Sequence, residues 1–256
     1  MIKVTFLGTG TSQGIPVVAC NCNVCKSANE RDKRLRSSLL VEVDGLHLVI
    51  DAGPDFRQQM LRADVKKLSA ILLTHEHYDH MAGLDEIRAY NWAQKRATDI
   101  FAEPRVNRSI RSVFAYVFAV EKYPGIPQMN LHDIGDEPFR IKDTTILPLR
   151  GYHHKLPVRG YRIGNFAYFT DIKTIEKSEY VKLKNLDVLV LNALRKESHL
   201  SHLSLDEALV LISEIKPKKT YLTHIGHQMG LYDEISKELP ENVFLAYDGL
   251  ELNLGD

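Results

Sequence analysis

The sequence has no long apolar run, no excess of charge and few cysteines. No stretch of its 256 residues approaches the roughly 20 apolar residues that a membrane-spanning helix requires. The 33 basic residues balance 33 acidic ones, so no net field draws the chain to nucleic acid or to an acidic membrane. The N-terminus, MIKVTFLGTG, is charged and strand-like and has no cleavage site. We therefore expect a cytoplasmic protein whose partner is neither a membrane nor a nucleic acid.

Strands and helices alternate along most of the chain, which is typical of the α/β class. Apolar runs predict strands at residues 2–7, 38–43, 46–50, 71–73, 99–102, 145–149, 159–163, 166–170, 187–192, 219–223, 243–247 and 250–254. Helices are expected at residues 55–63, 84–96, 104–121, 173–183, 205–215 and 231–238. Asp44-Gly45 is a hairpin turn signal, and Ser204-x-x-Glu207 is a capping box. Because no linker is evident, we expect a single domain over residues 1–256.

The strongest functional signal lies between Ala70 and Gly83, where an apolar run ends in four close polar residues, His75, His77, Asp79 and His80. The two histidines His75 and His77 are two positions apart, so at a strand end they project to the same side. Imidazole nitrogen and carboxylate oxygen are the ligands that a divalent transition metal takes. The segment therefore predicts the start of two metal positions, one at His75 and His77 and the other at Asp79 and His80.

Further ligand candidates follow strands in the second half of the sequence: His153 or His154, Asp171 and His224. Similar units of a strand followed by a ligand thus occur in both halves. We expect two mixed β-sheets packed face to face, with the ligand-bearing strand ends at one edge and helices on both outer faces, an αββα sandwich. Asp51 also ends an apolar strand, where it either orients a metal ligand or bonds to the backbone of a turn.

The H-x-H-x-D-H motif is identified as that of the metallo-β-lactamase superfamily. The resemblance implies a dinuclear site in which the first metal takes His75, His77 and His153, the second takes Asp79, His80 and His224, and Asp171 bridges both. It also implies hydrolysis by a metal-activated hydroxide. Zinc, manganese and iron all suit this donor set.

Three cysteines form a second cluster, Cys20-x-Cys22-x-x-Cys25. An odd number of cysteines so close together argues against a disulfide framework. Three thiolates can converge on one zinc, and a closed structural site requires a fourth ligand. His227, three residues beyond His224, is the candidate for that fourth ligand. The alternative is a loop with three reduced cysteines.

A narrower resemblance combines this cluster with the segments G-T-G-x-S-Q-G-I-P, H-E-H-Y-D-H, H-H-K-L and T-H-I-G-H-Q, between Gly8 and Gln228. The chain resembles the cyclic phosphodiesterases of the bacterial carbon–phosphorus lyase pathway. The resemblance implies a small-molecule substrate, a cyclic phosphodiester of the ribosyl type. Phosphodiester hydrolysis is the firmer part of that expectation.

Two histidines, His199 and His202, stand just before the capped helix at residue 205. A helix N-terminus favours anions, so a histidine there could hold a phosphate oxygen or protonate the leaving alkoxide. Related phosphodiesterases use such a histidine that is not a metal ligand. We expect His202 to be the general acid, rather than His199, and name it with Asp79 as the catalytic residues.

Three other functions use the same scaffold. A tRNA 3′-processing endonuclease would need an arm rich in glycine and proline that grips RNA, and the sequence has no such arm. A lactone or thioester hydrolase would leave the histidine before the helix unexplained. A non-catalytic metal-binding protein would be expected to lack some of the ligands, all of which are present here. The oligomeric state is open, and a homodimer is one possibility.

Overall fold

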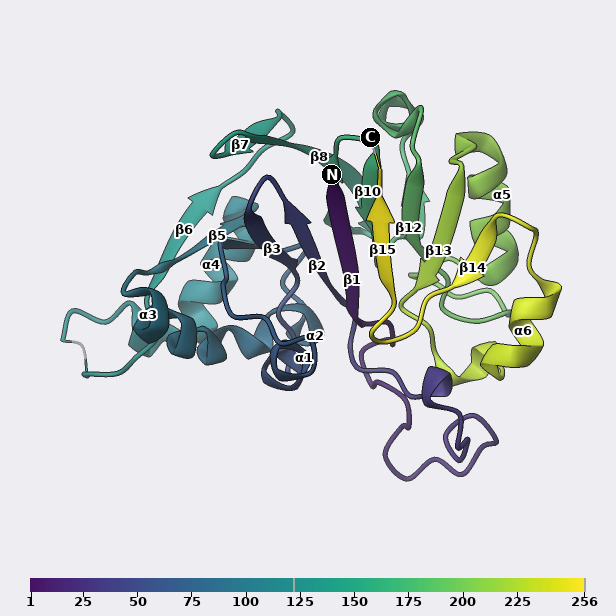
Figure 1. The fold of residues 1–256 in the computed structure, drawn as a ribbon, viewed down its shortest axis with the longest axis horizontal. Coiled ribbons are helices and arrows are strands. Elements are labelled where there is room, and N and C mark those ends of the chain that lie inside the picture. The colour runs from purple at the N-terminus through teal and green to yellow at the C-terminus, as the bar shows by residue number, and fades with distance from the viewer. Residues whose placement is uncertain (122, 256) are drawn as a thin grey trace. The chain divides into compact units, whose positions relative to one another are not determined.

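The computed structural model describes residues 1–121 and 123–255, which belong to two compact units (Figure 1). The first unit comprises residues 1–7, 37–135 and 251–256, and the second comprises residues 8–36 and 136–250. Each unit has one mixed β-sheet with helices, so the expected α/β class is confirmed. The single-domain boundary, 1–256, stays a prediction. No helix of the described residues is long and apolar enough to cross a membrane.

The sheet of the first unit has seven strands in the order β15-β1-β2-β3-β4-β5-β6. They are β1 (Ile2–Gly8), β2 (Ser38–Val43), β3 (Leu46–Ile50), β4 (Ala70–Leu72), β5 (Thr98–Ala102), β6 (Met129–Asp133) and β15 (Glu251–Leu254). The first and last strands pair antiparallel, which brings the two ends of the chain side by side (Figure 1). From β3 to β6 the strands are parallel. The carboxyl ends of β3 and β4 therefore lie at the same edge of this sheet.

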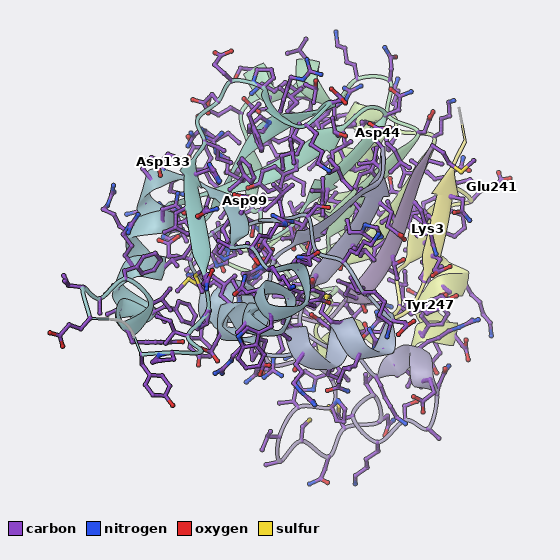
Figure 2. All side chains as sticks on the ribbon, turned by 60° about the vertical axis from the view of Figure 1, so that its left-hand side comes forward. Lys3, Asp44, Asp99, Asp133, Glu241 and Tyr247 are labelled. Atoms are coloured by element: carbon purple, nitrogen blue, oxygen red, sulfur yellow. The ribbon has the colours of Figure 1, made fainter. Side chains whose placement is uncertain are left out.

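The β2–β3 hairpin turns at Asp44 and Gly45, both of which have positive φ (Figure 2). This is the backbone that a two-residue turn requires. The helices of the unit connect its parallel strands. They are α1 (Phe56–Arg62), α2 (Tyr78–Met81), α3 (Arg88–Gln94) and α4 (Pro104–Val113), with 3₁₀ turns at Ala82–Ile87 and Ala115–Val117. Their apolar side chains form one buried cluster with strand residues such as Val49, Ile71 and Ile100.

The sheet of the second unit has eight strands, in the order β11-β8-β9-β10-β12-β13-β14 with β7 beside β8. They are β7 (Phe139–Ile141), β8 (Thr144–His153), β9 (Leu156–Ile163), β10 (Phe166–Phe169), β11 (Thr174–Ile175), β12 (Val188–Asn192), β13 (Lys219–Thr223) and β14 (Val243–Leu245). β10, β12, β13 and β14 are parallel. The helices are α5 (Leu205–Ile215) and α6 (Tyr232–Glu238), with 3₁₀ turns at Glu30–Asp32, Lys177–Leu183 and His227–Met229.

The segment Gly8–Arg36, which we call the N-terminal arm, belongs to the second unit although it follows β1 directly. The backbone N–H of Thr11 donates to the carbonyl of Ile225, and the N–H of Ile225 donates to the carbonyl of Thr9. The buried guanidinium of Arg34 donates to the hydroxyl of Thr9 and to the carbonyl of Ala246. These contacts hold the arm against the end of β13 and the segment after β14.

Most of the expected elements are confirmed, but some differ from the structure, and the structure has elements, among them α2 and β7, that were not expected. The helix expected at 104–121 ends at Val113, because Phe114 and Val117 turn inward and are buried. The helix expected at 173–183 is a short strand followed by a 3₁₀ turn, and the one expected at 84–96 begins as a 3₁₀ turn. β6 was not expected. It is an edge strand with mostly exposed polar residues, among them Asp133 at its end (Figure 2).

Candidate metal centres

The first unit brings four candidate ligands together at the end of β4. His75 and His77 lie on the extended segment after the strand, and Asp79 and His80 lie in the one-turn helix α2. The ring centroids of His75 and His77 are 4.5 Å apart, and those of His75 and His80 are 4.3 Å apart. Asp79 Oδ2 lies 3.1 Å from His80 Nε2. The short helix therefore brings His80 back beside His75, with Asp79 next to His80.

Asp51 is fully buried at the end of β3 and orients this cluster. His80 Nδ1 lies 2.7 Å from one carboxylate oxygen of Asp51, so His80 donates there and leaves Nε2 toward Asp79. The carboxylate also accepts hydrogen bonds from the backbone N–H and the hydroxyl of Thr74. Burial raises the pKa of Asp51, while His80 and Thr74 oppose that rise. The carboxylate of Asp51 thus makes both of the expected contacts, one with a predicted ligand and one with the backbone that follows a strand.

The second unit gathers His153, Asp171 and His202 so that one donor atom of each lies within 4.8 Å of the others. His153 ends β8, and its Nδ1 lies 2.9 Å from the carbonyl oxygen of Ser201, so its Nε2 is the atom left to bind a metal. His154 is exposed in the turn that follows. Of the two adjacent histidines, only His153 lies in the cluster.

Asp171 and His224 follow β10 and β13, and His224 Nε2 lies 3.1 Å from Asp171 Oδ1. Both residues have the left-handed backbone conformation, with φ of 56° and 55°, and Asp51 has it too, with φ of 64°. This conformation costs a residue other than glycine about 1–3 kcal/mol, and it is concentrated at functional sites. The parallel strands thus stop abruptly and turn a polar side chain across the sheet edge.

His202 lies between two predicted ligands. Its ring centroid is 4.4 Å from that of His153 and 4.8 Å from that of His224, and its side chain is only 10% exposed. Burial, followed by the charge of His224, lowers the pKa of His202 to about 3, although Asp171 opposes the fall. Its Nδ1 has no hydrogen-bond partner among the described residues. His199 is half-exposed, at 5.2 Å from His202, so the inner position belongs to His202.

The N-terminus of α5 is already occupied by its own side chains. Ser204 Oγ accepts a hydrogen bond from the backbone N–H of Glu207, and the Glu207 carboxylate accepts one from the N–H of Ser204. Lys173 pairs with the same carboxylate at 2.6 Å. The expected capping box is therefore confirmed. It places the carboxylate of Glu207 at the first turn of this helix, paired with Lys173, and the expected attraction of this helix end for a phosphate stays a prediction.

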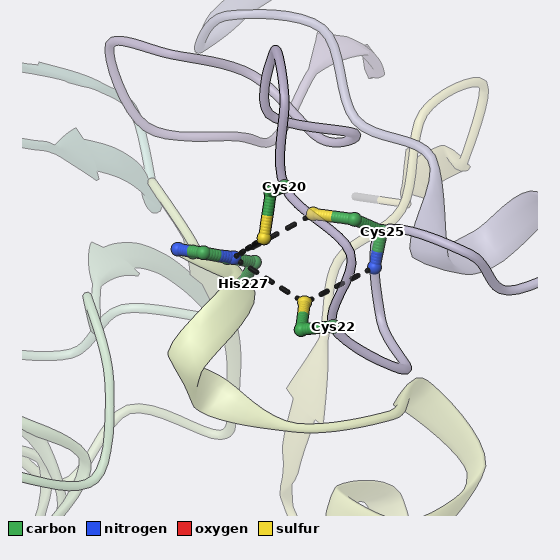
Figure 3. A group of neighbouring side chains, drawn as sticks. All are labelled: Cys20, Cys22, Cys25 and His227. Atoms are coloured by element: carbon green, nitrogen blue, oxygen red, sulfur yellow. Dashed lines mark hydrogen bonds between the residues drawn. The ribbon is translucent and has the colours of Figure 1, made fainter.

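The three cysteines surround the ring nitrogen of His227 (Figure 3). His227 Nδ1 lies 3.3, 3.4 and 3.5 Å from the sulfurs of Cys20, Cys22 and Cys25. A tetrahedral zinc with bonds of about 2.3 Å to sulfur and 2.0 Å to nitrogen separates those atoms by about 3.5 Å. The four donors have the types and spacing that a structural zinc requires.

The thiols of Cys22 and Cys25 differ in pKa. A hydrogen bond from the backbone N–H of Cys25 lowers the pKa of the Cys22 thiol to about 6. Burial and the neighbouring thiols raise the pKa of Cys25 to about 11. Three sulfurs at this spacing cannot all ionise without a nearby positive charge, and a bound zinc would supply one. The zinc assignment of Cys20, Cys22, Cys25 and His227 stays a prediction that this geometry suits.

Two supporting groups were not foreseen from the sequence. Thr74 holds Asp51 and lies 3.0 Å from His75 Nδ1, and the carbonyl of Ser201 orients His153. A signal for Thr74 was present, because a threonine precedes a candidate ligand at three strand ends, in Thr74-His75, Thr170-Asp171 and Thr223-His224. Thr170 likewise donates to the carboxylate of Asp171. No comparable signal marks Ser201, which acts through its backbone.

Comparison with known proteins gives a consistent result. Residues 47–225 match a family described as "Beta-lactamase superfamily domain". A crystal structure of a new diphosphatase from the PhnP family covers all of this chain and 98% of its own, with 36% identity and a TM-score of 0.93. An octanoyltransferase of Porphyromonas gingivalis is 42% identical over 98% of this chain and 51% of its own length. A ribonuclease Z of Nostoc punctiforme is 28% identical over 63% of this chain and 46% of its own. The chain thus spans about half the length of these two curated relatives.

Proposed function

Because this chain belongs to the β-lactamase superfamily, we propose that it is a metal-dependent hydrolase of a small phosphodiester. It is a hydrolase with the metallo-β-lactamase fold. The observation that carries hydrolysis at a phosphoryl group is the 36% identity, over the whole chain, to a PhnP-family diphosphatase. The sequence resemblance to cyclic phosphodiesterases supports the finer assignment, a cyclic substrate of the ribosyl type. A small-molecule partner follows from it, whereas a homodimer and a cytoplasmic location stay predictions.

The donor sets of the two units support metal dependence. In the arrangement that we propose, one ion would be bound by His75, His77 and His153. A second ion would be bound by Asp79, His80 and His224. Asp171 would be shared by both ions. All seven offer imidazole or carboxylate donors, which suit zinc, manganese or iron. Divalent ions held there would polarise a phosphoryl oxygen and lower the pKa of a bound water.

The protein's own residues have two further tasks in this proposal. Asp51 and Ser201 fix the ring orientation of His80 and His153, so that Nε2 of each is available to a metal. His202 is proposed to give a proton to the leaving oxygen. Burial lowers its pKa, and an anionic phosphodiester beside it would raise its proton affinity. His202 is therefore set to accept a proton when substrate binds and to release it to the leaving group.

Two alternatives have specific support. The similarity to a ribonuclease Z favours an RNA endonuclease, but equal numbers of basic and acidic residues give no general attraction to RNA. The 42% identity to part of an octanoyltransferase favours hydrolysis of an acyl thioester. That relative is about twice as long as the matched region, so its activity can reside in its other half.

The test is turnover of bis(p-nitrophenyl) phosphate by metal-depleted protein that is refilled with Mn²⁺ or Zn²⁺. An Asp79→Ala variant removes a proposed ligand. Asp143→Ala is the matched control, because that aspartate side chain is 97% exposed. We expect metal-dependent turnover in the wild type and in the control, and its loss in Asp79→Ala. Turnover of an octanoyl thioester or an aryl lactone without phosphodiester turnover would refute the proposal.

A further inference from the structure

Glu76 stands between the motif histidines His75 and His77, and the alternation of side chains along extended backbone would point it away from theirs. Its carboxylate accepts a hydrogen bond from the guanidinium of Arg105, which lies in the first turn of α4. Arg105 also lies 3.6 Å from the carboxylate of Glu103. One arginine thus connects the histidine segment to a helix that is distant in the sequence.

The ion pair between Glu76 and Arg105 is partly buried, so breaking it should cost more than breaking an exposed one. The side chain of Glu76 is 21% exposed and that of Arg105 is 28% exposed. The second carboxylate oxygen of Glu76 is buried and makes no hydrogen bond among the described residues. Leaving a partly buried carboxylate without its cation costs free energy. The carboxylate is then expected to turn toward another positive charge. A metal ion bound by His75 and His77 would be one such charge.

The helix that carries Arg105 is a fixed support. Val106 and Ile110 are fully buried in the core of the first unit. The amide of Asn107 donates to the carbonyl of His132 and to the carboxylate of Asp133 on β6. Since α4 is held in this way, the backbone that carries Arg105 is fixed by the sheet rather than by the histidine segment.

We propose that Arg105 is a positioning residue for the metal site. Its ion pair holds Glu76 on the α4 side of the segment, which keeps the imidazoles of His75 and His77 on the other side. It also prevents the carboxylate of Glu76 from turning to the metal as a competing ligand. The inference rests on the proposed metal-dependent function.

The test measures Mn²⁺ affinity by chelator competition on metal-depleted protein. Mn²⁺ is the probe because its preference for oxygen and nitrogen donors keeps it out of the thiolate cluster. Arg105→Met should weaken Mn²⁺ binding about 10–100-fold, the usual effect of losing a group that orients a ligand. Arg105→Lys should recover part of the affinity. Arg108→Met is the matched control, since Arg108 is exposed on the same helix, and its affinity should equal that of the wild type.

A double variant separates positioning from a purely structural role. Adding Glu76→Gln to Arg105→Met removes the freed charge, so it should restore most of the lost affinity. If Arg105→Met lowers the melting temperature but binds Mn²⁺ as tightly as the wild type, the proposal is overturned. It is also overturned if the double variant binds no better than Arg105→Met. Glu76→Gln alone, which keeps an acceptor for Arg105, should bind nearly as the wild type and provides the comparison if Arg105→Met does not fold.

Phosphodiester turnover, measured separately, distinguishes failure of the proposed function from failure of the role proposed for Arg105. Wild-type protein that binds Mn²⁺ but does not cleave the phosphodiester refutes the proposed function, and the affinity ratios still decide the role of Arg105. Wild-type protein that cleaves the phosphodiester, beside an Arg105→Met variant with unchanged affinity, refutes only the inference. Wild-type protein that binds no Mn²⁺ refutes both.

Discussion

Replacing Asp51 by asparagine should change which nitrogen of His80 carries the proton. The two side chains have nearly the same shape, so the core around the end of β3 should stay packed. The asparagine oxygen can still accept the hydrogen bond from the backbone N–H of Thr74, which is 2.8 Å long in the wild type. Its amino group must then occupy the other position, opposite His80 Nδ1 and the hydroxyl of Thr74. An amino group cannot accept a hydrogen bond, so His80 Nδ1 can no longer donate there.

The expected result is a switch of tautomer. His80 Nδ1 becomes the acceptor, the proton moves to Nε2, and the lone pair that a metal needs disappears from Nε2. Loss of such an orienting carboxylate typically lowers metal affinity about 10–100-fold. The stability cost is smaller. Three hydrogen bonds to a charged acceptor become weaker neutral ones, while the burial that raises the pKa of Asp51 no longer opposes folding. We expect a net loss of about 1–2 kcal/mol.

Two measurements check this reasoning. The ¹⁵N spectrum of the imidazoles reports the tautomer of His80 in metal-free protein, and chelator competition with Mn²⁺ reports the affinity. Asp51→Ala is the contrasting variant. It leaves the N–H of Thr74 and His80 Nδ1 unpaired in a buried place, so it should cost more stability, about 2–5 kcal/mol. An Asp51→Asn protein with the wild-type tautomer and the wild-type affinity would refute the argument.

Three further predictions concern stability and the cysteine cluster. Gly83→Ala should destabilise the protein by about 2–3 kcal/mol, because its Cβ would lie 2.1 Å from the carbonyl oxygen of Gly53; an unchanged urea midpoint would contradict this. His227→Ala should lower the zinc retained after gel filtration by about one ion per chain, and equal zinc content would show that the cysteines suffice. Hydrogen bonds from Arg159 and a neighbouring arginine lower the pKa of Asp136 to about 2. The ionised carboxylate therefore contributes fully to the stability of the folded protein above about pH 4, and this contribution is lost as the pH falls through 2. Asp136→Asn should therefore cost about 1 kcal/mol at pH 7, given 61% side-chain exposure, and urea unfolding should show that cost vanish at pH 2; a cost independent of pH would count against the pair.

Local patterns carried most of what could be predicted about the site. The spacing of His75, His77, Asp79 and His80 predicts two pairs of ligands, and a one-turn helix produces that arrangement within a single segment. The cysteine cluster could also be predicted, since its three cysteines lie close together in the sequence. The choice between His153 and His154 could not, because adjacent residues at a strand end differ only in which one turns inward. A hydrogen bond to the carbonyl of Ser201, 48 residues later, orients His153, and its choice as the ligand stays a prediction.

Elements whose ends depend on distant contacts were predicted less well. No helix-ending residue precedes Pro124, so the sequence pattern continues the α4 helix to residue 121. The helix stops at Val113 because Phe114 and Val117 are buried in the core. β6 has too few apolar residues to indicate a strand, and its pairing with β5 supplies the hydrogen bonds instead. Propensity describes a segment in isolation, and here the core overrides it.

The sequence by itself determined the α/β class, the superfamily and the ligand types, because each depends on residues close together in the chain. Tertiary structure alone decided that the N-terminal arm joins the second unit, through the buried guanidinium of Arg34. It alone decided that Asp51 holds His80 and that Arg105 holds Glu76. These contacts join residues 29 positions apart, and the sequence contains no periodicity that could reveal such a separation. The types of ligand could be predicted because they occur in short motifs, whereas the orientation of the side chains depends on tertiary packing.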